Sequence, residues 1–190
     1  PEPDPEPLPS PPEPTIVGTA AGRETISGTD GDDVIWGGGG ISDRLMGGAG
    51  DDIYIVDHAR TTVAEGSSDG TDTVYTSADR LVINSYVEIV YLLEGAELVR
   101  TSHGDNVIYG NDQANDLSAG GGDDTIFGGG GDDLLTGAYG NDTLDGGAGT
   151  DTAAYSGFMA DYLISQNDDD SLTVTDLVGS DGTDTLIAVE

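Results

Sequence analysis

Aspartate recurs at a fixed spacing in the second half of the chain. In six consecutive copies of nine residues, read from Thr101, the sixth position holds an aspartate or an asparagine and the eighth is apolar. The sixth-position residues are Asn106, Asn115, Asp124, Asp133, Asp142 and Asp151. The last four copies also keep glycine at the fourth position. Regularly spaced carboxylates, beside glycines that let backbone carbonyls turn inward, form the all-oxygen ligand set that Ca²⁺ prefers.

A shorter array of the same kind runs from Thr19 to Ile55. Its copies read TAAGRETIS, GTDGDDVIW, GGGGISDRLM and GGAGDDIYI. Their acids are Glu24, Asp33, Asp43 and Asp52, and the third copy contains one extra residue before its acid. The same oxygen chemistry is therefore predicted near both ends of the repeat region.

Other metals and catalysis fit the composition less well. The chain has no cysteine, and its only histidines, His58 and His103, are flanked by no second ligand pair, so the usual ligand set of a zinc site is not complete. Mg²⁺ keeps its waters and prefers a compact octahedron, whereas Ca²⁺ accepts six to eight oxygens in flexible geometry. There is no lysine and no combination of nucleophile and base on a plausible scaffold. We expect no enzymatic activity from this chain.

The net charge is strongly negative and limits the partners. Acidic residues number 37 against five arginines, which gives a formal charge of −32. Nucleic acids and anionic membranes are disfavoured by such a charge, whereas cations are attracted. No apolar run approaches the roughly 20 residues of a membrane span. We expect a monomer whose main partners are calcium ions.

The nonapeptide also predicts its own local structure. Glycines at alternate positions let the chain curl tightly, and the three residues that follow form a minimal strand whose middle side chain points inward. Two copies then complete one coil, so that copies i and i+2 stack about 4.8 Å apart. The prediction is an all-β solenoid with short parallel strands on two faces.

Stacking brings the sixth-position carboxylates into line. Two charges about 5 Å apart repel by roughly 1 kcal/mol in water and about 3 kcal/mol in a partly screened environment. One apolar side chain per strand offers too small a core to overcome a row of such repulsions. We therefore expect the chain to stay largely unfolded without metal and to couple cation binding to folding.

The repeat G-G-x-G-x-D-x-apolar-x resembles the calcium-binding nonapeptide of the repeats-in-toxin (RTX) family. The resemblance is closest over residues 119–154 and 28–55. It implies a right-handed parallel β-roll in a secreted bacterial protein that folds outside the cell after type I secretion. It also implies a glycine-poor solenoid segment between two arrays and a capping segment, DGTDTLIAVE, at the C-terminus.

In this family an ion lies between turns i and i+2. The first turn gives the carbonyls of positions two and four, the second gives those of positions one and three, and each gives its aspartate. The resemblance then implies three ligand sets: Gly120, Gly122, Asp124 with Gly137, Tyr139, Asp142; Gly129, Gly131, Asp133 with Gly146, Ala148, Asp151; and Thr29, Gly31, Asp33 with Gly47, Ala49, Asp52. Asp43 is a further candidate ligand, although Glu24 suits the partner position poorly. Turns with Asn106 or Asn115 lose a charge and should bind more weakly or stay empty.

Composition divides the chain into five parts. We expect a linker over 1–15, a first calcium-binding array over 16–56, a glycine-poor β-solenoid segment over 57–100, a second array over 101–155 and a C-terminal β-hairpin cap over 156–190. The linker alternates proline with acidic residues, which favours an extended, stiff spacer. Such a spacer suggests another domain upstream in the same chain. The leading hypothesis is a module whose calcium-induced folding supports the secretion and stability of a larger extracellular protein.

Aromatic residues at the ninth position leave an alternative open. Trp36, Tyr109 and Phe127 should face outward, where they could stack on sugar rings. The chain would then be a calcium-dependent polysaccharide-binding or adhesion module, for alginate-type glycans for example, attached to a carbohydrate-active enzyme. The same residues could instead pack beneath the intervening segment or the cap, which general burial trends favour.

Overall fold

The chain folds as an all-β solenoid, as predicted. A computed structural model describes residues 8–67, 69–83 and 86–190, which form nineteen strands and one short 3₁₀ turn. Within these ranges no helix is long and apolar enough to cross a membrane. Part of the predicted linker, residues 1–7, lies outside the described residues, and residues 8–14 form no helix or strand.

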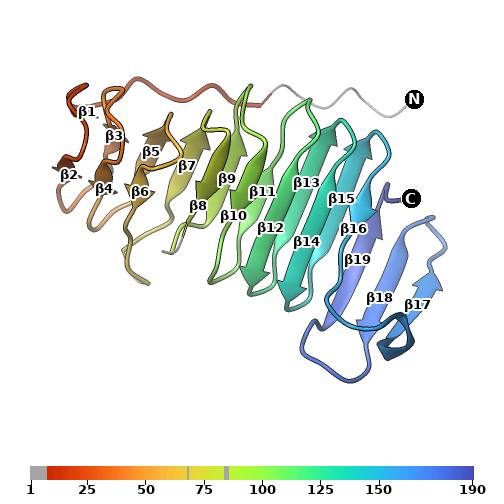
Figure 1. The fold of residues 1–190 in the computed structure, drawn as a ribbon. Coiled ribbons are helices and arrows are strands. Elements are labelled where there is room, and N and C mark those ends of the chain that lie inside the picture. Colours follow the sequence, from red (N-terminus) through yellow and green to blue (C-terminus); the bar gives the residue numbers. More distant parts are fainter. Residues whose placement is uncertain (1–7, 68, 84–85) are drawn as a thin grey trace.

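The strands form two faces of a flattened stack, which Figure 1 shows from the N-terminal end in red to the C-terminal end in blue. One face is an eleven-stranded sheet in the order β1 (Ile16–Val17), β3 (Val34–Trp36), β5 (Ile53–Val56), β7 (Thr73–Thr76), β9 (Ile89–Leu92), β11 (Val107–Tyr109), β13 (Thr125–Gly130), β15 (Thr143–Ala148), β19 (Thr183–Ile187), β18 (Leu172–Asp176) and β17 (Tyr162–Gln166). The other face holds two sheets. They are β2 (Thr25–Ser27), β4 (Arg44–Met46) and β6 (Thr62–Val63), then β16 (Thr152–Ala153), β14 (Leu134–Tyr139), β12 (Asp116–Gly121), β10 (Leu98–Arg100) and β8 (Arg80–Val82).

Two nonapeptides make one coil. On the first face Ile108 pairs with Ile126, and Ile126 with Leu144, in parallel register. On the second face Leu117 pairs with Leu135 in the same way. Each step is 18 residues, so the predicted stacking of copies i and i+2 is confirmed.

The core is a narrow column between the faces. The eighth-position residues Ile108, Leu117, Ile126, Leu135 and Leu144 are at most 1 % exposed, whereas their neighbours along each strand are not buried. The glycine-poor segment also fills its corners with apolar side chains. The buried residues at or next to its turns are Ala78, Ile83, Val87, Leu92 and Ala96. That segment has a larger apolar core for each coil than the arrays have.

The C-terminal cap contains the predicted hairpin and one strand more. β17 and β18 pair antiparallel, preceded by the 3₁₀ turn Met159–Asp161. β18 then pairs antiparallel with β19, and β19 pairs parallel with β15. The chain therefore returns to the solenoid in its last residues and adds another rung to it (Figure 1).

Candidate calcium sites

The sixth-position side chains form a ladder along each edge of the solenoid. The backbone N–H of Asp124 donates to Oδ1 of Asp142 over 2.9 Å, and that of Asp133 donates to Oδ1 of Asp151 over 2.8 Å. In the first array the N–H of Asp33 donates in the same way to Oδ1 of Asp52 over 2.8 Å. One carboxylate oxygen of each acceptor is thereby used within the chain, and it fixes the direction of the other.

The second oxygen of these carboxylates has no partner. It is buried and lacks any hydrogen bond in six aspartates of the two arrays: Asp43, Asp52, Asp124, Asp133, Asp142 and Asp151. Their side chains are at most 3 % exposed. An unsatisfied buried polar group costs about 1–3 kcal/mol, and more when it is charged. Among the described residues the single ion pair joins Arg100 to Asp116, both partly exposed, so none of the six buried aspartates has an ion-pair partner there.

Glycine at the first position leaves room for this oxygen. A side chain at Gly137 would collide with Oδ2 of Asp142, and one at Gly128 would collide with Oδ2 of Asp133. Positions two and four have positive φ, for example 104° at Gly120 and 130° at Gly122, which glycine adopts without strain. The turns with glycine at the first position are therefore open cradles around one buried carboxylate oxygen, whereas the Asp124 turn holds Ala119 at that position.

The structure brings together the residues of each predicted ligand set on neighbouring turns. In the first set the N–H of Gly122 donates to the carbonyl of Tyr139 over 3.0 Å, beside the Asp124–Asp142 contact. The second set repeats this pattern with Gly131 and Ala148 at 2.8 Å. The remaining members lie on the same turns, but which of them bind metal stays a prediction.

The N-terminal turns are less open. Asp33 is only half-buried, and its Oδ2 accepts hydrogen bonds from the N–H and the hydroxyl of Thr29 at 2.7 and 2.9 Å. The third predicted set, Thr29, Gly31 and Asp33 with Gly47, Ala49 and Asp52, thus keeps one carboxylate oxygen that is both buried and unpartnered, on Asp52. Glu24 likewise uses both oxygens on Thr19, at 2.6 and 2.8 Å, which leaves Asp43 as the only open acid of that pair.

The side-chain amides of Asn106 and Asn115 form hydrogen bonds within the chain. Nδ2 of Asn106 donates to the carbonyl of Val87 over 2.7 Å, and Nδ2 of Asn115 donates to the carbonyl of Ala96 over 3.3 Å. The amide oxygen faces the cradle in both turns and is already used: Oδ1 of Asn115 accepts from the N–H of Asn111, and Oδ1 of Asn106 accepts from the hydroxyl of Thr101. An asparagine turn therefore offers a neutral, hydrogen-bonded oxygen where an aspartate turn offers a bare, charged one. This geometry supports the expectation that Asn106 and Asn115 bind calcium weakly or not at all, which itself stays a prediction.

Burial perturbs the acids of the second array. It raises the pKa of Asp124 to about 7 and that of Asp133 to about 6, against an ordinary value of 3.8. A hydrogen bond from the backbone of Asn106 or Asn115 opposes each rise, and the neighbouring carboxylates Asp142 and Asp151 add to it. The carboxylates therefore need a counter-ion or a proton in the folded chain.

Sequence reasoning missed acids that continue the ladders beyond the arrays. The N–H of Asp142 donates to Oδ1 of Asp184, and the N–H of Asp151 donates to Oε2 of Glu190, both over 2.8 Å. Asp72 plays the same part for Asp52, over 2.9 Å. A signal was present: Asp184 and Asp72 each stand two residues before an inward apolar residue, which is the spacing of the repeats.

The outward aromatics stack on one another. The ring centroids of Tyr75 and Tyr91 lie 4.9 Å apart, those of Tyr91 and Tyr109 4.7 Å, and those of Tyr109 and Phe127 5.0 Å, all in stacked orientation. Trp36 instead donates its Nε1–H to Asp57. Tyr91 and Tyr109 therefore have both faces covered by neighbouring rings, whereas sugar stacking needs a free face. The polysaccharide hypothesis stays a prediction, and the Tyr109 ring offers no free face on which a sugar could stack.

Comparison with known families agrees with this geometry. The model of the RTX calcium-binding nonapeptide repeat matches residues 19–54, 93–126 and 118–153, which cover most of both arrays and more than half of the chain. Comparison with curated proteins finds no match. Glycine cradles, stacked copies of nine residues and buried aspartates with an open oxygen all follow from the matched repeat. The chain belongs to the RTX calcium-binding nonapeptide-repeat family.

Proposed function

We propose that this chain is a calcium-binding β-roll module whose calcium-dependent folding supports the secretion and stability of a larger extracellular bacterial protein. The observation that carries the proposal is the set of buried aspartate oxygens without hydrogen-bond partners along both edges of the arrays. Carboxylate and backbone oxygens are the ligands of Ca²⁺, and the cradles offer both.

The chain's own residues oppose folding when these oxygens are left bare. The formal charge is −32, and in the arrays most strands bury a single apolar side chain. Bound Ca²⁺ would supply positive charge and coordination to the aspartates that hold it, which makes binding energy available as folding energy. The folded form would then require metal.

Calcium dependence would place folding outside the cell. Extracellular calcium modules typically have Kd values of about 10⁻⁴ to 10⁻³ M, far above the range of cytosolic sensors. A chain of this charge would stay extended where calcium is scarce, which is the form that an exporter can pass. The RTX repeat is typical of secreted bacterial proteins, and this agreement supports the proposal.

A parent protein is part of the proposal. The proline and acidic residues of segment 1–15 have the composition of a stiff spacer, which would hold the roll away from a neighbouring domain. The proposed role needs no catalytic group in the roll itself. We assign any enzymatic activity to other parts of the parent.

Far-UV circular dichroism of the full chain tests the proposal. The chain in EDTA should show little β signal, and millimolar Ca²⁺ should restore it cooperatively. Mg²⁺ at the same concentration is the control and should restore much less, because it keeps its waters. A chain that retains its full β signal in EDTA would contradict the proposed function.

A further inference from the structure

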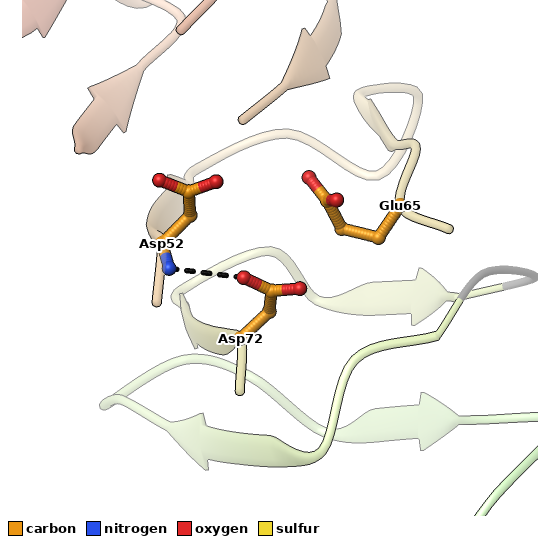
Figure 2. A group of neighbouring side chains, drawn as sticks. All are labelled: Asp52, Glu65 and Asp72. Carbon is orange, nitrogen blue, oxygen red and sulfur yellow. Dashed lines mark hydrogen bonds between the residues drawn. The ribbon is translucent and has the colours of Figure 1, made fainter. Parts of the chain in front are cut away.

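Three carboxylates from separate segments meet where the first array gives way to the glycine-poor segment. Asp52 precedes β5, Asp72 precedes β7, and Glu65 lies on the connection after β6. One carboxylate oxygen of each lies within 4.8 Å of the other two. Figure 2 shows the Glu65 side chain reaching toward the two aspartates, which are joined by the hydrogen bond from the Asp52 N–H to Asp72.

Each of these acids has an unpartnered, buried oxygen. Oδ2 of Asp52, Oδ2 of Asp72 and Oε2 of Glu65 have no hydrogen bond. The side chain of Asp52 is 0 % exposed and that of Asp72 is 1 % exposed. The three acids thus lie together, and among the described residues none of these three oxygens has a hydrogen-bond donor.

Glu65 is held in this place by a residue that is exceptional in the first array. Tyr54 occupies the inward eighth position, where the other copies have an aliphatic side chain, and it is 0 % exposed. Its hydroxyl donates to Oε1 of Glu65, and the N–H of Gly47 donates to the same oxygen over 2.9 Å. Both contacts leave Oε2 free. The core itself therefore positions the third carboxylate.

The segment around Glu65 cannot form an ordinary cradle. Residues 64–71 read AEGSSDGT and lack the G-G-x-G of the repeats. The turn of Gly47 to Asp52 thus faces a coil without the usual glycine-rich turn. A glutamate side chain supplies an oxygen there instead, and Asp72 supplies the sixth-position acid.

We propose that Asp52, Glu65 and Asp72 form a calcium site outside the nonapeptide pattern. It extends the row of ions by one coil, from the first array into the glycine-poor segment. Three hard anionic oxygens suit Ca²⁺ better than a softer metal. This proposal rests on the proposed function in one respect: both assume that the bound ion is calcium.

Counting bound ions tests this site. Native mass spectrometry and equilibrium dialysis at saturating Ca²⁺ would compare the full chain with its variants Glu65→Gln and Glu94→Gln. Glu94 is an exposed turn residue, so its variant matches the charge change without touching the cluster. Glu65→Gln should bind one ion fewer than the parent, or bind it at least about tenfold more weakly, whereas Glu94→Gln should match the parent.

The outcomes separate this site from the module's function. A parent chain that binds calcium, with Glu65→Gln equal to it in number and affinity, overturns the site alone. A parent chain that binds no calcium overturns the proposed function as well. If Glu65→Gln does not fold in calcium, Tyr54→Phe decides, because it keeps the ring in the core and releases Glu65. Weaker binding of one ion by Tyr54→Phe supports the site, and unchanged binding overturns it.

Discussion

Replacing Asp133 by asparagine should change the stability of the module in opposite directions with and without calcium. The amide keeps an oxygen to accept the hydrogen bond from the N–H of Asn115, now 2.8 Å long. It replaces the unpartnered Oδ2 with an NH₂ group. Asn115, one coil earlier, shows the other orientation, in which Nδ2 bonds a carbonyl of the preceding coil and Oδ1 faces the cradle and accepts from the N–H of Asn111.

The size of the effect follows from the buried charge. Burial, and then the nearby charge of Asp151, raise the pKa of Asp133 from 3.8 to about 6. At about 1.4 kcal/mol for each pKa unit, ionised Asp133 destabilises the metal-free fold by about 3 kcal/mol at pH 7.5. The neutral amide removes this cost, and either orientation of the amide keeps one hydrogen bond to the preceding coil. With calcium, the variant loses a charged ligand and should be less stable than the parent.

Chemical and thermal unfolding, followed by circular dichroism in EDTA and in Ca²⁺, would measure both effects. If the chelated chain is unfolded in buffer, titration with trimethylamine-N-oxide brings its folding transition into range. Asp132→Asn is the matched control. Asp132 is exposed, and its Oδ1 accepts from the N–H of Thr150, a bond that the amide can keep.

Two results would refute this reasoning. Equal destabilisation of Asp133→Asn in EDTA and in calcium would mean that Oδ2 is not a bare, costly oxygen in the metal-free fold. Equal effects of Asp132→Asn and Asp133→Asn would mean that net charge matters and the position in the cradle does not.

Three further predictions concern protons, backbone and core. In EDTA, acidification from pH 7.5 to pH 4 should stabilise the fold. Burial raises the pKa of Asp124 to about 7, so its contribution to stability is fully present below about pH 4 and is lost as the pH rises through 7. The concentration of trimethylamine-N-oxide needed to fold the chelated chain should therefore fall on acidification, and a rise would contradict this sign. Ala138→Gly should stabilise the calcium-bound fold by up to about 1 kcal/mol, because Ala138 has a φ of 80°. Gly129→Ala, at the same repeat position, should destabilise that fold. Melting temperatures that change in the opposite directions would show that this φ carries no strain. Leu135→Ala should lower the free energy of unfolding by about 3 kcal/mol in a denaturant titration, since Leu135 is 0 % exposed. Its neighbour Leu134 is 39 % exposed, so Leu134→Ala should lower it by less than about 1 kcal/mol. Similar losses for the two variants would contradict a core made of one column of side chains.

The repeat made the arrays predictable from sequence. A nine-residue period fixes which side chain points inward, so the period alone places Leu135 and Leu144 in the core and Asp133 and Asp151 on one edge. Stacking at 18 residues follows because neighbouring coils repeat the same pattern. Both the fold and the pairing of the acids depend on this local rule.

Positions that depend on long-range contacts do not follow from the nine-residue period alone. The side chain of Glu65 is positioned by a hydrogen bond from the hydroxyl of Tyr54 in β5, and the nine-residue period does not link these two residues. Asp184 joins the ladder because β19 returns to β15 after a hairpin, a pairing across 42 residues. The aromatic stack likewise depends on Tyr75 and Tyr91, which the glycine-poor segment places in register with the second array.

A crystal structure grown with calcium, with anomalous scattering recorded for the ions, would locate the bound metal directly. We predict ions within about 2.4 Å of Oδ2 of Asp124, Asp133, Asp142 and Asp151, and no ion at the Asn115 turn. The opposite result would be these four oxygens bound only to water or to protein donors. It would contradict the claim that the aspartate cradles fold around calcium.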